Sequence, residues 1–194
     1  MELSMREAQV IDVFRGTGAL LEGHYVLSSG LHSPKYLQCA IALQSPVIAS
    51  DFGAAIADHF VSQNIETVAS PAIGGLIIGY EAARHLGAKF IWTERENGKM
   101  TLRRGFSVKK DERVLVVEDV ITTGGSTRDT IQVLVSSGAL VVAAASIVDR
   151  SGGQAEVGVP RFSLVTLNIP AVSPDQCAAC KRGEPAVKPG SRKQ

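Results

Sequence analysis

A chain of 194 residues, 45% of them apolar, is long enough to bury a full hydrophobic core without disulfides or a structural metal ion. Its 20 Lys and Arg nearly balance its 19 Asp and Glu, and a formal charge of +1 gives no reason to expect nucleic acid or an anionic membrane as a partner. No apolar run approaches membrane-spanning length and the amino terminus lacks an apolar export signal, so we expect a cytoplasmic protein.

The first 44 residues predict a small hood. Apolar residues within 5–21 have helical spacing, which predicts a helix that ends near Gly16 or Gly18. Residues 25–43 alternate apolar and polar side chains around Ser-Gly and Ser-Pro pairs, a pattern that indicates short antiparallel strands. A further helix is expected to begin at Ser45-Pro46, because proline is favoured at the first helical position.

From residue 67 onward, apolar strands alternate with helices, which is the order of an α/β fold with a mostly parallel sheet. We expect strands at 67–70, 89–93, 114–117, 141–148 and 163–168. Ligands of such sheets bind outside the carboxyl ends of the strands. We therefore predict one domain over residues 1–194, with a core at about 45–170 and a hood made of about 1–44 and the C-terminal tail.

The segment after the third expected strand carries the most specific signal. Glu118 and Asp119 precede a turn of Thr, Gly and Ser residues, and a helix is expected over 126–135, capped by Ser126 or Thr127. Free amides at the glycines, the hydroxyl groups and the helix dipole favour a phosphate dianion. Ionised carboxylates only accept hydrogen bonds, so the acidic pair suits the vicinal hydroxyls of a ribose. The alternative is an ordinary capped turn; Walker A and Rossmann fingerprints are absent.

Two other loops at expected strand ends are candidates for anion binding. Residues 70–75 lie between a strand and a helix, so their amides can form a second anion cradle, or their glycines can simply permit a tight turn. Residues 93–110 are rich in Lys and Arg, with Gly98 and Gly105 as flexible points. This basic segment is either a mobile loop or a solvated charged hairpin.

Residues 118–126 resemble the phosphoribosyl pyrophosphate (PRPP) signature of the type I phosphoribosyltransferases. Residues 26–36, the Asp149-Arg150 pair and residues 187–192 are similar to the orotate phosphoribosyltransferases of that group. The resemblance implies a central, mostly parallel sheet flanked by helices, with a small N-terminal hood. It also implies transfer of the 5-phosphoribosyl group from PRPP to orotate, giving orotidine 5'-monophosphate and pyrophosphate in pyrimidine biosynthesis. A purine-base phosphoribosyltransferase and a PRPP-sensing regulatory protein remain open alternatives on the same fold.

The resemblance also implies roles for individual residues. PRPP would be bound by Glu118, Asp119, Val120, Ile121, Thr122, Thr123, Gly124, Gly125, Ser126, Ala72 and Gly74. The catalytic residues would be Glu118, Asp119, Lys99 and Arg95, with Arg103 and Arg104 as further candidates. Orotate would contact Thr122, Arg150 and Ser29, with the planar guanidinium of Arg150 gripping the orotate carboxylate.

The same resemblance implies Mg2+ as a cofactor that rides on the substrate without dedicated protein ligands. It further implies a homodimer with shared active sites, in which the basic segment closes as a lid over the neighbouring subunit's site. The chain departs from better-known bacterial relatives, because Ile73 and Ser28 stand where those enzymes have lysine and the lid lacks their histidine.

Three cysteines, Cys39, Cys177 and Cys180, are too few and too uneven for a disulfide framework and predict reduced thiols. The Cys177-x-x-Cys180 spacing is that of a zinc knuckle, but it supplies only two of four ligands. A second chain would have to supply the other two across a dimer axis; the alternative is a solvent-side turn. The histidines at 24, 32, 59 and 85 are scattered without ligand spacing, which favours structural or solvated roles.

Overall fold

A six-stranded sheet forms the centre of the protein. The computed structural model describes residues 5, 7–27 and 29–189. The strand order is β5-β4-β3-β6-β7-β8, and all neighbours run parallel except the antiparallel β4–β5 pair. The strands are β3 (Thr67–Pro71), β4 (Lys89–Glu96), β5 (Lys99–Leu102), β6 (Arg113–Ile121), β7 (Leu140–Asp149) and β8 (Arg161–Thr166). The predicted α/β fold with a mostly parallel sheet is confirmed.

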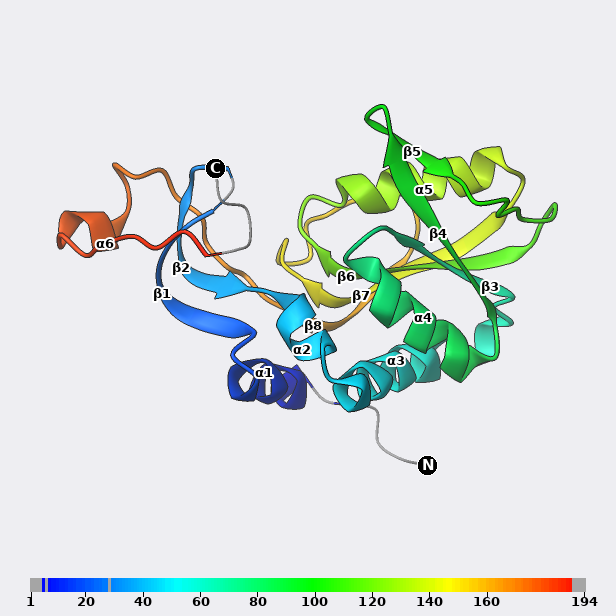
Figure 1. The fold of residues 1–194 in the computed structure, drawn as a ribbon, viewed down its shortest axis with the longest axis horizontal. Helices are drawn as coiled ribbons and strands as arrows, with labels where there is room; N and C mark the ends of the chain where they lie inside the picture. Colours follow the sequence, from blue (N-terminus) through cyan, green and yellow to red (C-terminus); the bar gives the residue numbers. More distant parts are fainter. Residues whose placement is uncertain (1–4, 6, 28, 190–194) are drawn as a thin grey trace.

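Helices cover both faces of this sheet (Figure 1). On one face, α3 (Pro46–Phe60) and α4 (Gly75–Leu86) pack against the side chains of Leu115 and Val117 of β6. On the other face, α5 (Gly125–Ser136) packs against Val114 and Val116. The alternation follows from strand geometry, since successive side chains point to opposite faces. A strand buried on both faces reads as the continuous apolar run that the sequence contains.

A smaller layer lies beside the core, at the left of Figure 1. It consists of α1 (Glu7–Gly16), the antiparallel strands β1 (Leu20–Val26) and β2 (His32–Leu37), the short helix α2 (Cys39–Leu43), and the C-terminal segment with α6 (Ala178–Lys181). The arrowheads of β6 and β7 point toward this side (Figure 1). The hood therefore lies next to the carboxyl ends of the strands, where ligands of parallel sheets bind. The 3-10 turn η1 (Val61–Gln63) follows α3 in the core.

Most predicted elements of the core are present, and the differences have local causes. Ser45 caps α3 by accepting a hydrogen bond from the amide of Ile48, and Pro46 is the first helical residue as expected. Strand β6 continues to Ile121, so the acidic pair lies within the strand and not after it. Residues Cys39–Leu43 form a helix where strand was predicted. Among the described residues, no helix combines the length and the apolar character needed to cross a bilayer.

The first part of the basic segment forms a hairpin, as the charged-hairpin alternative predicts, while the closure of this segment as a lid stays a prediction. Strands β4 and β5 pair antiparallel from Thr93↔Leu102 to Glu96↔Lys99. Asn97 and Gly98 form the two-residue turn, and both have positive φ, at 51° and 80°. Asn-Gly is the preferred sequence for such a turn, because its twist matches that of the flanking strands.

Candidate active site

The loop between β6 and α5 presents an open helix amino terminus. The helix cap is Gly124, with φ 73°, and no side chain hydrogen-bonds to the first amides. The cap predicted at Ser126 or Thr127 is therefore absent, because the hydroxyl of Thr127 donates to Glu118 instead. The first amides of an α-helix have no intrahelical acceptor, and the helix dipole adds positive potential there. The loop has the properties of an anion site.

Polar groups surround this amino terminus. Within the described residues, no hydrogen bond is recorded for the hydroxyls of Thr122, Thr123 or Ser126, and none of the three side chains is buried. Ile121 is 1% exposed and anchors the loop in the core, so this residue faces a ligand only through its backbone. Val120 likewise packs against the core, and its amide is held by Asp119. Of the residues predicted to bind the anion, Val120 and Ile121 thus pack into the core. Thr122, Thr123 and Ser126 leave their hydroxyl groups available to a ligand.

The two carboxylates of β6 point to opposite faces of the sheet. Glu118 accepts a hydrogen bond from Thr127 on the α5 face, whereas Asp119 lies on the α4 face, where its Oδ1 accepts from the Val120 amide at 2.9 Å. Burial raises the pKa of Glu118 to about 7, and the charge of Asp119 adds to this increase while the Thr127 hydrogen bond opposes it. Burial also raises the pKa of Asp119. Sequence reasoning missed Thr127 as the residue that positions Glu118.

The loop after β3 lies against Asp119. A Cβ atom on Gly74 would be 2.6 Å from Oδ1 of Asp119, and one on Gly75 would be 2.9 Å from the Val117 carbonyl oxygen. Only glycine permits this close approach. The amide of Ala72 donates to the Thr93 carbonyl at 2.8 Å, so it is not free for an anion. An anion cradle in this loop therefore depends on the amides that follow Ala72.

Arg150 lies beside the turn at the end of β6. Its amide donates to the Ile121 carbonyl at 2.8 Å, which places Arg150 next to Thr122. The preceding Asp149 is paired with Arg161 at 2.6 Å, so Asp149 does not neutralise Arg150 in the recorded ion pairs of the described residues. Burial raises the pKa of the Cys39 thiol, with a further increase from Asp119 and an opposing effect of Arg150. Sγ of Cys39, at the start of α2, lies 3.9 Å from the carbonyl oxygen of Asp119.

The remaining predicted residues are not brought to this loop within one chain. Arg95 forms a 2.8 Å ion pair with Asp129 of α5, and Arg103 and Arg104 pair with glutamates of their own hairpin. Lys99 is exposed, and no side-chain partner is recorded for it in the described part of the chain. Ser29 is exposed in the β1–β2 turn, where its Oγ accepts from the Leu31 amide at 3.4 Å. Ser28 lies outside the described residues.

The amino-acid sequence matches a known family. Residues 42–173 match the family model described as "Phosphoribosyl transferase domain", which covers more than half of the chain. This chain belongs to the phosphoribosyltransferase family. Within the family it is similar to curated proteins named orotate phosphoribosyltransferase. The protein of Desulforamulus reducens is 50% identical over 97% of this chain and 98% of its own length. That of Caldicellulosiruptor bescii is 50% identical over 98% of this chain and 100% of its own length.

Solved phosphoribosyltransferase structures share the fold. The crystal structure of orotate phosphoribosyltransferase from Aeropyrum pernix is 30% identical, with a TM-score of 0.66 over 81% of this chain and 93% of that chain. An adenine phosphoribosyltransferase from Thermoanaerobacter pseudethanolicus has a TM-score of 0.61 over 69% of this chain and 88% of that chain at 16% identity. The fold therefore does not by itself distinguish a pyrimidine from a purine substrate, and the site must do so.

Proposed function

We propose that this chain is an orotate phosphoribosyltransferase, which transfers the 5-phosphoribosyl group from PRPP to orotate and releases pyrophosphate. The observation that carries the proposal is the convergence of three features at one edge of the sheet: the uncapped amino end of α5, the buried acidic pair of β6, and Arg150 beside Thr122. The name shared by relatives that are 50% identical over nearly the whole chain supports the same activity.

Each feature suits one part of the reactants. The free amides at the start of α5, with the hydroxyls of Thr122, Thr123 and Ser126, would bind the 5-phosphate. Glu118 and Asp119 would accept hydrogen bonds from the ribose hydroxyls and face the positive charge that grows on the ring as the bond to pyrophosphate breaks. The reaction then depends on positioning and charge stabilisation and needs no covalent intermediate with the protein.

The base would be held between Arg150 and the hood. A guanidinium group binds a carboxylate with two parallel hydrogen bonds, and orotate carries a carboxylate whereas purine bases do not. Leaving a half-buried guanidinium without a partner is costly, so Arg150 favours orotate over a purine. Ser29, in the turn of the hood hairpin, is the proposed contact to the edge of the base.

Magnesium is the proposed cofactor. Mg2+ prefers oxygen ligands and would be carried mainly by PRPP itself, without dedicated protein ligands; the carboxylate of Asp119, which would bind the ribose hydroxyls, would be the nearest protein group. A magnesium ion bound with PRPP supplies positive charge next to the leaving pyrophosphate.

We also propose one domain over residues 1–194 that acts as a homodimer. Support for a single domain comes from the main apolar cluster, which joins Val10 and Phe14 of α1 with Phe52 of α3 and Leu164 of β8. Support for shared sites comes from Lys99, an exposed cation of the β4–β5 hairpin, for which no side-chain partner is recorded in the described residues.

The decisive experiment is orotate-dependent release of pyrophosphate by the purified protein with PRPP and magnesium. We expect turnover with orotate and none with adenine or guanine. Turnover with a purine alone would establish the purine alternative. PRPP binding without turnover on any base would establish the regulatory alternative.

Arg150 provides the matching test of substrate choice. Arg150→Ala should lower kcat/KM for orotate by about a hundred-fold, because a charge-assisted bidentate contact is lost. Binding of PRPP, measured by calorimetry, should change little. The control is Arg84→Ala, which removes an exposed arginine of α4 that pairs with Glu81. Unchanged orotate kinetics in Arg150→Ala would refute the assignment of this residue.

A further inference from the structure

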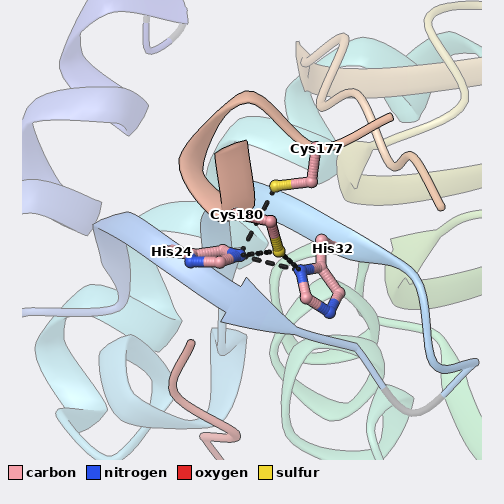
Figure 2. Close-up of side chains that lie close together, drawn as sticks. All are labelled: His24, His32, Cys177 and Cys180. Carbon is pink, nitrogen blue, oxygen red and sulfur yellow. Dashed lines mark hydrogen bonds between the residues drawn. The ribbon is translucent and has the colours of Figure 1, made fainter. Parts of the chain in front are cut away.

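Two histidines of the hood and two cysteines of the C-terminal segment form a compact cluster away from the phosphoribosyl loop. His24 lies on β1, His32 lies on β2, and Cys177 and Cys180 flank the start of α6. Figure 2 shows one ring nitrogen of each histidine and both sulfur atoms turned toward one another. One potential ligand atom from each residue lies within 4.8 Å of all the others. His24, His32 and Cys177 are buried, and Cys180 is partly exposed.

The distances in the cluster are close to those of a tetrahedral site. Nε2 of His24 is 2.7 Å from Nδ1 of His32, 3.4 Å from Sγ of Cys177 and 3.6 Å from Sγ of Cys180. Sγ of Cys180 is 3.2 Å from Nδ1 of His32. Around a tetrahedral zinc ion with normal bond lengths, such atoms lie about 3.3 to 3.8 Å apart. The two imidazoles would need to separate by only about 0.6 Å.

The surroundings of His24 orient it as a metal ligand. Its Nδ1 lies 2.9 Å from the carbonyl oxygen of Glu184, and this nitrogen must be the donor because a carbonyl only accepts. In a neutral imidazole the other nitrogen then carries a lone pair and is an acceptor, and in His24 that nitrogen, Nε2, points into the cluster. A second hydrogen bond of this kind is the usual support of metal-bound histidines.

The chemistry of the four groups favours zinc. Two sulfur and two nitrogen ligands in tetrahedral arrangement suit Zn2+, and two thiolates cancel its charge, which allows the complex to be buried. Both cysteines are free thiols in the structure, so no disulfide competes for the sulfur atoms.

We propose that His24, His32, Cys177 and Cys180 bind one structural zinc ion within a single chain. Binding releases the two thiol protons to solvent, and the four protein ligands leave no open position for catalysis. The sequence favoured a solvent-side turn for Cys177 and Cys180 over a zinc site completed by a second chain; the proposed site takes all four ligands from the same chain. The view of His24 and His32 as residues without ligand spacing is corrected for the same reason, since the antiparallel pairing of β1 and β2 brings them together.

The site would fasten the C-terminal segment to the hood. Val172 exchanges two backbone hydrogen bonds with His32, and Val187 bonds to His24 and Val26, so this segment borders both strands of the hairpin. A two-stranded sheet is marginally stable by itself. The ion would cross-link this sheet to the C-terminal segment, and the same hairpin carries Ser29 at its turn.

The first test is the metal content of the full chain, purified under reducing conditions without chelator and measured by mass spectrometry of the elements. We expect about one zinc per chain, and less than about 0.2 per chain in Cys177→Ser and in Cys180→Ser. Matched controls are Cys39→Ser and His85→Gln, which remove a cysteine and a histidine outside the cluster and should keep the full zinc content.

The second test uses the unsubstituted chain, so it remains valid if the variants fail to fold. After removal of metal, titration with Co2+ should give the absorption of a tetrahedral thiolate site, saturating at one equivalent and abolished by Zn2+. Removal of zinc should lower the melting temperature by about 5 °C or more. These readouts do not depend on catalysis, so they can fail while the transferase assay succeeds.

Three outcomes would overturn the proposal. The first is a fully reduced chain that takes up neither zinc nor cobalt. The second is full zinc content in the Cys177→Ser and Cys180→Ser variants. The third is a Cys177–Cys180 disulfide in the protein as isolated, which would make the pair a redox element instead of a metal site.

Discussion

At the scale of single residues, Glu118 is a proposed site residue whose burial as a carboxylate lowers the stability of the folded chain. Burial raises the pKa of its carboxyl from 4.5 to about 7. Between these two values the folded, ligand-free chain holds a proton that the unfolded chain has lost, so the free energy of unfolding falls as the pH rises through this window. The raised pKa of Asp119 has the same sign. In the ligand-free chain, burial therefore disfavours the ionised forms of both carboxyl groups. Positive charge bound next to them would favour the ionised forms.

Replacing Glu118 should separate stability from function. Above pH 7, Glu118→Gln should increase the free energy of unfolding of the ligand-free chain by about 2 to 3 kcal/mol, while kcat/KM with PRPP falls by at least about a hundred-fold. Denaturant unfolding at pH 5 and pH 8 measures the first effect. Glu156→Gln, at an exposed glutamate, is the control. The same pH dependence of stability in the parent and in Glu118→Gln would contradict the assigned environment.

Thr127 offers a finer test of the same carboxyl group. Its hydroxyl donates to Glu118 and opposes the increase in pKa. Thr127→Val keeps the shape of the side chain but removes the donor, so the pKa of Glu118 should rise further. We expect the pH at which half of the PRPP affinity is lost on the acid side to move upward by about one unit. A loss of affinity that is equal at every pH would indicate a packing effect alone.

At the scale of elements, the turn into α5 depends on Gly124. Its φ is 73°, and an added Cβ would lie 2.8 Å from Cγ1 of Val157. Gly124→Ala should reduce the free energy of unfolding by about 1 to 3 kcal/mol and raise KM for PRPP about ten-fold or more, because the amides that face the phosphate would shift. Steady-state kinetics and denaturant unfolding measure the two effects.

Gly87 is the matched control for Gly124. It has φ 66° at the end of α4, and nothing lies within 4 Å of an added Cβ. Gly87→Ala should therefore show the backbone strain without the collision and leave KM for PRPP unchanged. The double variant Gly124→Ala with Val157→Ala should recover part of the KM effect. An unaltered KM in Gly124→Ala would contradict the role of this turn.

Elements differed in how far the sequence could predict them. Residues 118–126 are contiguous, so their chemistry was readable from the sequence as a pattern. The basic segment was harder, because its glutamates Glu94 and Glu96 and the distant Asp129 pair with three of its arginines. These pairs arise because the chain after β5 runs back beside β4 and because α5 packs near the hairpin, and local propensity does not encode either contact. The excess of cations, with Gly98 and Gly105 as flexible points, therefore suggested a loop.

At the scale of the whole molecule, the sequence did not predict contacts between residues that lie far apart along the chain. Gly74 meets Asp119, and Arg150 meets Ile121, because the strand order places β6 between β3 and β7. The sequence predicted that such loops meet at one edge, but not which atoms touch. The His24 and Cys180 side chains are more than 150 positions apart, and only the return of the C-terminal segment to the hood brings them together. No local pattern links such a pair.

The largest-scale prediction concerns shared sites in a dimer. In a mixed dimer of Lys99→Ala and Arg150→Ala subunits, the site that keeps Arg150 would receive the intact Lys99 from its partner, while the other site lacks both groups. Random exchange makes half of the dimers mixed, so an equimolar mixture should recover about 25% of the parental activity, although each variant alone is nearly inactive. Native mass spectrometry confirms the exchange. Full exchange without recovery would show that Lys99 does not act across the interface.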